Sequence, residues 1–144
     1  MMPEPMKPKI YHLNPNERER FIVRITGILE SRGGVAFAYI FGSFVEGGPF
    51  HDVDIGLYLS ETPKEHFTEF GLTLSQNLSR ELEIPVDVRI LNLAPVSFLY
   101  HVIRGKLIFE KDEEIRARVV ERTTQRYLDL KPIIRKGVKE AFGG

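Results

Sequence analysis

The stretch VAFAYIFGSFVEGGPFHDVDIGLYL, residues 35–59, decides the fold of this chain. It opens with a nearly continuous apolar run, Val35 to Phe41, next to glycines, which indicates a buried strand. Residues 42–51 contain three glycines and a proline, and they predict a turn-rich connection. From Asp52 to Leu59 polar and apolar residues alternate, so we expect a second strand that buries one of its faces.

Helices and strands alternate in the rest of the sequence. Helical spacing of apolar residues predicts an amphipathic helix that begins at Asn14 or Asn16 and ends near Gly33. Further elements are expected as follows: a helix from Thr62-Pro63 to Pro85, a strand over 86–91, a short helix after Pro95, a strand over 106–110, and a helix from about Asp112 that Pro132 should end or kink. This order predicts an α/β or α+β domain in which helices cover one sheet of about four strands.

Length and composition limit the possible functions. The 144 residues fit one domain, which we place at residues 14–144 with a helix at its C-terminal end, after an irregular arm at residues 1–13. Lys+Arg and Asp+Glu both number 20, which argues against a protein that wraps nucleic acid. There is no cysteine, so thiolate catalysis and thiolate-bound zinc are excluded. We find no signal peptide and no apolar stretch long enough for a membrane span, and we expect a cytoplasmic protein.

Three aspartates are the candidate metal ligands. Asp52 and Asp54 are two residues apart on one strand, so both side chains project from the same face. Asp87 projects from the polar face of a later strand. Like charges on neighbouring strands repel each other, and a divalent cation would relieve that repulsion. Hard carboxylate ligands of this kind suit Mg²⁺, which also binds substrate phosphates.

Gly42 and Ser43 are the candidate phosphate-binding residues. They follow directly after the first strand, and glycine lets the main chain approach a phosphate closely. If Ser43 opens a helical turn, its free N–H groups and its hydroxyl form an anion site. A phosphate cradle beside a metal site is the minimum equipment for phosphoryl-type transfer.

Each of these signals has an ordinary structural explanation when taken alone. A Gly-Ser pair can be a simple turn, and an Asp-x-Asp pair can be the solvated edge of a strand. Their combination in this order, with Asp87 on a later strand, favours a functional site. His51 is interpreted as a residue that shapes the loop, and Arg89 as a partner either of Asp87 or of a phosphate.

The run Gly42-Ser43-Phe44, Gly48-Pro49-Phe50-His51, Asp52-Val53-Asp54 resembles the Gly-Ser…Asp-x-Asp signature of the DNA polymerase β-like nucleotidyltransferases. The resemblance implies a mixed sheet with helices packed on it. It also implies that Asp52 and Asp54 hold two Mg²⁺ ions, that Gly42 and Ser43 bind the triphosphate, and that Asp87 completes the metal site and helps to deprotonate the attacking hydroxyl.

Over about residues 20–130 the chain is further similar to the minimal nucleotidyltransferase (MNT) subgroup, especially to those members that are antitoxin partners of HEPN-domain ribonucleases. The similar segments are Val86 to Pro95, Val102 to Glu110 and Tyr127-Leu128-Asp129. This resemblance implies transfer of AMP from ATP to a tyrosine hydroxyl of a HEPN toxin, with release of pyrophosphate. Because the net charge is zero and no fingers-like or DNA-binding region is found, we expect no DNA template, and the lack of a long apolar stretch predicts no membrane association.

One departure from the family keeps an alternative open. Eight residues separate Ser43 from Asp52, fewer than in many relatives. An ungapped alignment would place Asp54 and Gly56 at the catalytic positions, with loss of one ligand, and the chain would then be an inactive binding module that neutralises its partner by contact. A small-molecule transferase of the aminoglycoside-modifying type is a third possibility, although relatives of that type carry an additional helical domain.

Overall fold

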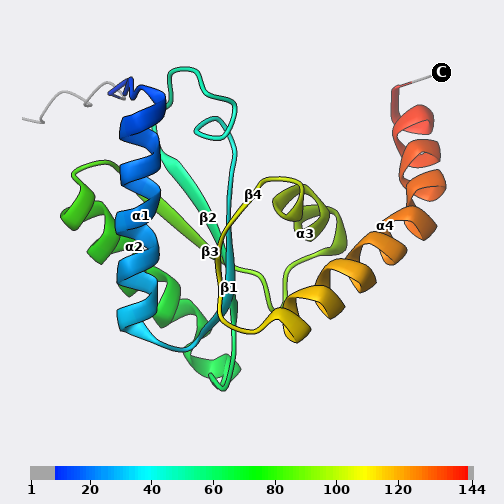
Figure 1. Ribbon diagram of the computed structural model, residues 1–144. Helices are drawn as coiled ribbons and strands as arrows, with labels where there is room; N and C mark the ends of the chain where they lie inside the picture. Colours follow the sequence, from blue (N-terminus) through cyan, green and yellow to red (C-terminus); the bar gives the residue numbers. More distant parts are fainter. Residues whose placement is uncertain (1–8, 143–144) are drawn as a thin grey trace, which may run out of the picture.

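The computed structural model describes residues 9–142 (Figure 1). The order of helices and strands is the predicted one. Its elements are α1 (Pro15–Arg32), β1 (Val35–Phe41), β2 (Val53–Leu59), the short 3₁₀ helix η1 (Lys64–His66), α2 (Phe67–Leu82), β3 (Val86–Ile90), α3 (Val96–Ile103), β4 (Lys106–Glu110) and α4 (Glu113–Phe142). A search of the described helices finds none with the length and apolar character of a membrane span.

The four strands form one mixed sheet in the order β3-β2-β1-β4. β1 pairs antiparallel with both of its neighbours, whereas β2 and β3 run parallel. The helix α2 makes the connection between β2 and β3, as parallel strands require. This sheet confirms the predicted fold class and brings the second and third predicted strands side by side.

Helices cover both faces of the sheet, and this corrects one expectation. α1 and α2 bury the face that carries Val53, Ile55 and Leu57 (Figure 1). The opposite face, which we expected to be solvated along β2, packs under α3 and the first turns of α4. A Cβ at Gly56 would lie 2.7 Å from Cγ1 of Val102, so the absence of a side chain at Gly56 is what lets α3 approach the sheet.

One helix starts later than predicted, whereas the last helix follows one of the two alternatives predicted for it. The helix expected from Thr62-Pro63 starts only at Phe67, because Pro63 has an extended conformation (φ −62°, ψ 140°) and η1 intervenes. Pro132 does not end α4, which continues to Phe142. Figure 1 shows that α4 changes direction between its orange and red parts, as expected of a helix that loses a hydrogen bond at an internal proline.

The start of α1 agrees with the sequence. Asn14 is the N-cap, and its side chain accepts a hydrogen bond from the N–H of Glu17 at 2.8 Å, while the Glu17 carboxylate accepts one from the N–H of Asn14 at 2.9 Å. In the preceding arm, Tyr11 forms two main-chain hydrogen bonds with Phe50. Residues 1–8 of the predicted arm lie outside the described residues.

Side chains of α2 satisfy the outer edge of β3, which no further strand covers in the described sheet. The hydroxyl of Ser75 accepts a hydrogen bond from the N–H of Val88 at 3.0 Å, and the hydroxyl of Ser79 bonds to both main-chain groups of Val86. An unpaired strand edge invites pairing with another chain, and these two serines protect it. They also fix the position of β3, which carries Asp87.

Candidate active site

Strand register brings two of the three predicted carboxylates together. Asp54 of β2 is paired in register with Asp87 of β3, so the two side chains leave neighbouring strands on the same face. Asp52 lies just before β2 and is exposed, whereas Asp54 is half-buried. On its other side Asp54 is opposite Phe41, the last residue of β1. The order of the strands therefore places the end of β1, Asp54 and Asp87 next to one another.

Asp54 is the electrostatically perturbed member of this group. Burial raises its pKa to about 6, the charges of Asp52 and Asp87 add to the increase, and Arg89 and His101 oppose it. A carboxyl group that is pushed toward its neutral form by like-charged neighbours is typical of an acidic site that a cation would stabilise.

Asp87 is engaged by a neighbouring arginine. Its Oδ2 accepts a hydrogen bond from Nε of Arg89 at 3.0 Å, which is one of the two roles predicted for Arg89. In the described part of the chain, no group of three or more acidic or histidine side chains is arranged to hold a metal ion. The donor set nevertheless fits Mg²⁺, because two aspartates meet on adjacent strands and a third lies two residues away.

Gly42 lies against the carboxylate of Asp54. Its φ of 82° is in the left-handed region, and a Cβ added there would lie 2.5 Å from Oδ2 of Asp54. Both observations require glycine at this position. The first residue of the predicted phosphate cradle is thus in direct contact with the central carboxylate.

Ser43 opens a series of tight turns, as the phosphate-binding prediction requires. The N–H groups of Val45 and Glu46 donate to the carbonyls of Gly42 and Ser43 at 3.1 and 3.2 Å. Within the described residues, the N–H groups of Ser43 and Phe44 donate to no main-chain carbonyl. The Ser43 side chain is exposed. Free N–H groups at the start of a turn form a site for an anion such as a phosphate.

Arg18 of α1 holds the loop between β1 and β2 in place, which the sequence did not reveal. Its guanidinium donates to the carbonyls of Leu13, Phe44 and Gly48 and lies 4.8 Å from the ring centre of Phe44. His51 shapes the same loop, because its Nδ1 lies 3.0 Å from the carbonyl oxygen of Lys9. These hydrogen bonds therefore connect the arm, α1 and the loop beside Ser43.

The substitution Arg18→Lys tests the importance of these hydrogen bonds. Lysine keeps the charge but cannot donate to three separate carbonyls in a fixed plane. We expect a loss of about 2 kcal/mol in the free energy of unfolding, measured by urea denaturation, together with weaker binding of nucleotide. Arg20→Lys on the exposed side of α1 is the control. Equal stability of the two variants would contradict the role of Arg18.

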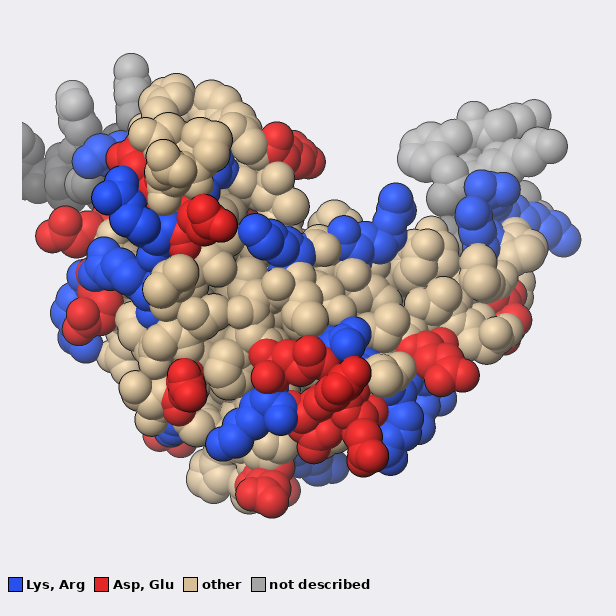
Figure 2. Space-filling model, viewed as in Figure 1, with Lys and Arg blue, Asp and Glu red and all other residues tan. Residues whose placement is uncertain are grey.

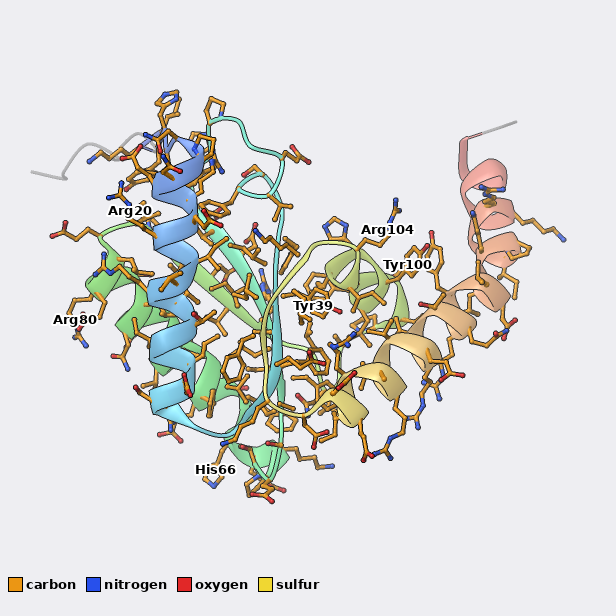
Figure 3. All side chains as sticks on the ribbon, in the orientation of Figure 1. Arg20, Tyr39, His66, Arg80, Tyr100 and Arg104 are labelled. Carbon is orange, nitrogen blue, oxygen red and sulfur yellow. The ribbon has the colours of Figure 1, made fainter. Side chains whose placement is uncertain are left out.

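α3 adds residues to the site that sequence reasoning missed. The charge of His101 acts on Asp54, and its ring lies 5.7 Å from that of Phe41, edge to face. Arg104 follows at the end of α3, and its side chain points away from the sheet toward the top of the view in Figure 3. In Figure 2 basic side chains line the hollow between the upper left of the molecule and α4. The sequence gives no sign that α3 packs close to β2, because the two elements are far apart along the chain.

The chain is similar to one protein family and to several solved structures. Residues 24–114 match the family model described as "Polymerase beta, Nucleotidyltransferase". No curated protein sequence matches the chain. Among solved structures, a chain of the tri-AMPylated HEPN toxin of Shewanella oneidensis in complex with MNT antitoxin has a TM-score of 0.70 at 18 % identity, over 88 % of this chain and 99 % of that one.

Two further structures have the same fold. A chain of the toxin-antitoxin MntA-HepT has a TM-score of 0.69 at 17 % identity, over 87 % of this chain and 99 % of that one. A chain of a toxin-antitoxin with AMP-PNP has a TM-score of 0.65 at 19 % identity, over 91 % of this chain and 100 % of that one. Because the family model covers more than half of its residues, the chain belongs to the polymerase β nucleotidyltransferase family.

Proposed function

We propose that this chain is a Mg²⁺-dependent nucleotidyltransferase that moves AMP from ATP to a hydroxyl group of a HEPN-domain toxin and so acts as its antitoxin. The register pair Asp54–Asp87, with Gly42 against the Asp54 carboxylate, is the observation that carries the proposal. The proposal is supported because Gly42, Asp54 and Asp87 meet at one end of the sheet and Asp52 lies just before β2.

Each residue has a role in this reaction. Asp52, Asp54 and Asp87 would hold two Mg²⁺ ions, which, when bound, neutralise charge on the triphosphate. The N–H groups at Ser43 and Phe44 hold the β- and γ-phosphates. Asp87 accepts the proton of the acceptor hydroxyl, whose oxygen bonds to the α-phosphorus. The bond from that phosphorus to the bridging oxygen breaks, and pyrophosphate leaves.

The choice of acceptor comes from the structural neighbours. One of them is a HEPN toxin that carries three AMP groups in complex with MNT antitoxin, and another is a toxin-antitoxin complex with an ATP analogue. The match covers almost the whole length of the neighbours' chains. These neighbours therefore have no acceptor-binding domain in addition to the part that matches the present chain. These neighbours favour a protein rather than an aminoglycoside as the acceptor, and a tyrosine hydroxyl is proposed because the resemblance to MNT antitoxins implies it.

Intact mass spectrometry tests the proposal. The chain is mixed with MgATP and with HEPN-domain proteins of the same genome, and a mass gain of one or more AMP units on the partner is expected. Peptide mapping should locate the AMP on a tyrosine. The Asp52→Asn, Asp54→Asn double variant should give no gain, whereas Glu65→Gln, which changes an exposed carboxylate on η1, should behave as the wild type.

The same experiment separates the second candidate function. The ion pair between Asp87 and Arg89 is the observation that favours a protein which neutralises its partner by contact alone. A tight complex without mass gain, in which the double variant still inhibits the partner's ribonuclease activity, would establish that contact function and refute AMP transfer.

A further inference from the structure

An apolar groove lies beside the proposed active site, at the outer edge of β3. It has a volume of about 700 Å³ and runs between α2 and the segment that leads into α3. Asp87 and Arg89 line one end of it, and the remaining wall is mostly apolar, including Phe67, Leu72, Leu93 and Phe98. Asp87 therefore belongs both to the carboxylate group and to the groove.

We propose that this groove binds the protein segment that presents the acceptor hydroxyl, by seating an apolar side chain next to the acceptor tyrosine. The inference rests on the proposed transfer of AMP to a protein, and it identifies which surface of the chain selects the acceptor.

The first argument is the order of the parts across the sheet. The phosphate cradle follows β1, Asp54 lies on β2, Asp87 lies on β3, and the groove lies beyond β3. In phosphoryl transfer the attacking and leaving oxygens are roughly in line with the phosphorus between them. With pyrophosphate held at the Ser43 turn, the attacking hydroxyl approaches from the β3 side, where the groove opens.

The second argument is the exposure of the groove's rims. Leu72 of α2 is 61 % exposed, and Leu93 is 72 % exposed. Both are large apolar side chains that line the same groove. A single exposed leucine is ordinary, but a pair that faces one apolar channel beside reactive carboxylates indicates a surface that another macromolecule covers. A nucleoside base within the groove would leave these outer side chains in water.

The mode of binding follows from the edge of β3. The hydroxyl of Ser79 already bonds to both outward main-chain groups of Val86, and that of Ser75 accepts a hydrogen bond from the N–H of Val88. An acceptor segment therefore cannot add to β3 as a further strand along these residues. It is held through its side chains, so the groove recognises the sequence that surrounds the tyrosine.

The test uses Leu93→Asp and Leu72→Asp in the full chain. Both positions are exposed, so the fold is retained, which circular dichroism and urea denaturation would verify. The matched control is Val23→Asp, which replaces an apolar side chain that is 64 % exposed on α1. Affinity for the HEPN-domain partner is measured without ATP by calorimetry, and the KM values for partner and for MgATP are measured in the transfer assay.

We expect each groove variant to weaken partner affinity and to raise the partner KM by about tenfold or more, with an unchanged KM for MgATP. Unchanged partner affinity in both variants would overturn the inference. A raised KM for MgATP with unchanged partner affinity would also overturn it and would assign the groove to the nucleoside. If the wild type binds the partner without transferring AMP, the proposed function fails, and the affinity comparison still decides the role of the groove.

Discussion

Asp54→Asn is expected to abolish AMP transfer and, at the same time, to stabilise the metal-free protein. The carboxylate is half-buried between Gly42 and Asp87, where burial and the neighbouring aspartates raise its pKa to about 6. Asparagine has nearly the same shape but no charge. We therefore expect the transfer rate to fall by about three orders of magnitude, as when a metal ligand that stabilises several kcal/mol of transition-state charge is lost.

The stabilisation has a defined dependence on pH. Because the pKa of Asp54 is higher in the folded chain than its ordinary value of 3.8, the folded state binds the proton more tightly, and this contribution to stability is lost as pH rises from about 4 through about 6. The asparagine of the variant does not titrate. The variant should match the wild type near pH 4 and exceed it above pH 6, by about 1 to 2 kcal/mol after allowance for solvent screening.

Thermal unfolding in EDTA at several pH values measures this difference. Addition of Mg²⁺ should then raise the melting temperature of the wild type and leave that of the variant unchanged, because only the wild type gains a bound ligand. Glu65→Gln serves as the control, since it removes an exposed carboxylate of η1. A variant that is less stable than the wild type at pH 7 would show that Asp54 is not under electrostatic strain.

Local patterns in the sequence were sufficient for most of the fold. The alternation of polar and apolar residues located β2 and β3, and the cap candidates Asn14 and Asn16 located the start of α1 to within two residues, because both signals depend on neighbouring residues. The apolar run of β1 was recognised as a buried strand, although only the structure shows that helices cover both of its faces. The site carboxylates were recognised by spacing, and their roles remain a proposal.

Most of the features that escaped prediction depend on long-range contacts. Arg18 reaches the loop at Phe44, and Ser75 reaches β3, across separations that no periodicity reports. His101 acts on Asp54 only because α3 packs over the sheet at Gly56. The start of α2 was placed too early because the cap-and-proline signal at Thr62-Pro63 is also compatible with a 3₁₀ turn.

Gly42→Ala is expected to reduce both the stability of the chain and its AMP transfer. An alanine there must adopt a φ of 82° and place its Cβ 2.5 Å from Oδ2 of Asp54. The left-handed backbone alone costs about 1 to 2 kcal/mol. The clash displaces either the carboxylate or the Ser43 turn, and a displacement of about 1 Å in a catalytic group can reduce the rate by about a hundredfold. We expect both a loss of stability and a loss of AMP transfer of this size.

Gly47→Ala separates the two causes. Gly47 also has a positive φ, 88°, but a Cβ there would meet no atom within 4 Å. The control should therefore lose a similar amount of stability, measured by urea denaturation, and keep most of its transfer activity. If Gly42→Ala keeps as much activity as Gly47→Ala, backbone strain explains the requirement for glycine at position 42, and contact with Asp54 is not what organises the site. If only Gly42→Ala is inactive, the close approach of the Ser43 turn to the central carboxylate is the feature on which the chemistry depends.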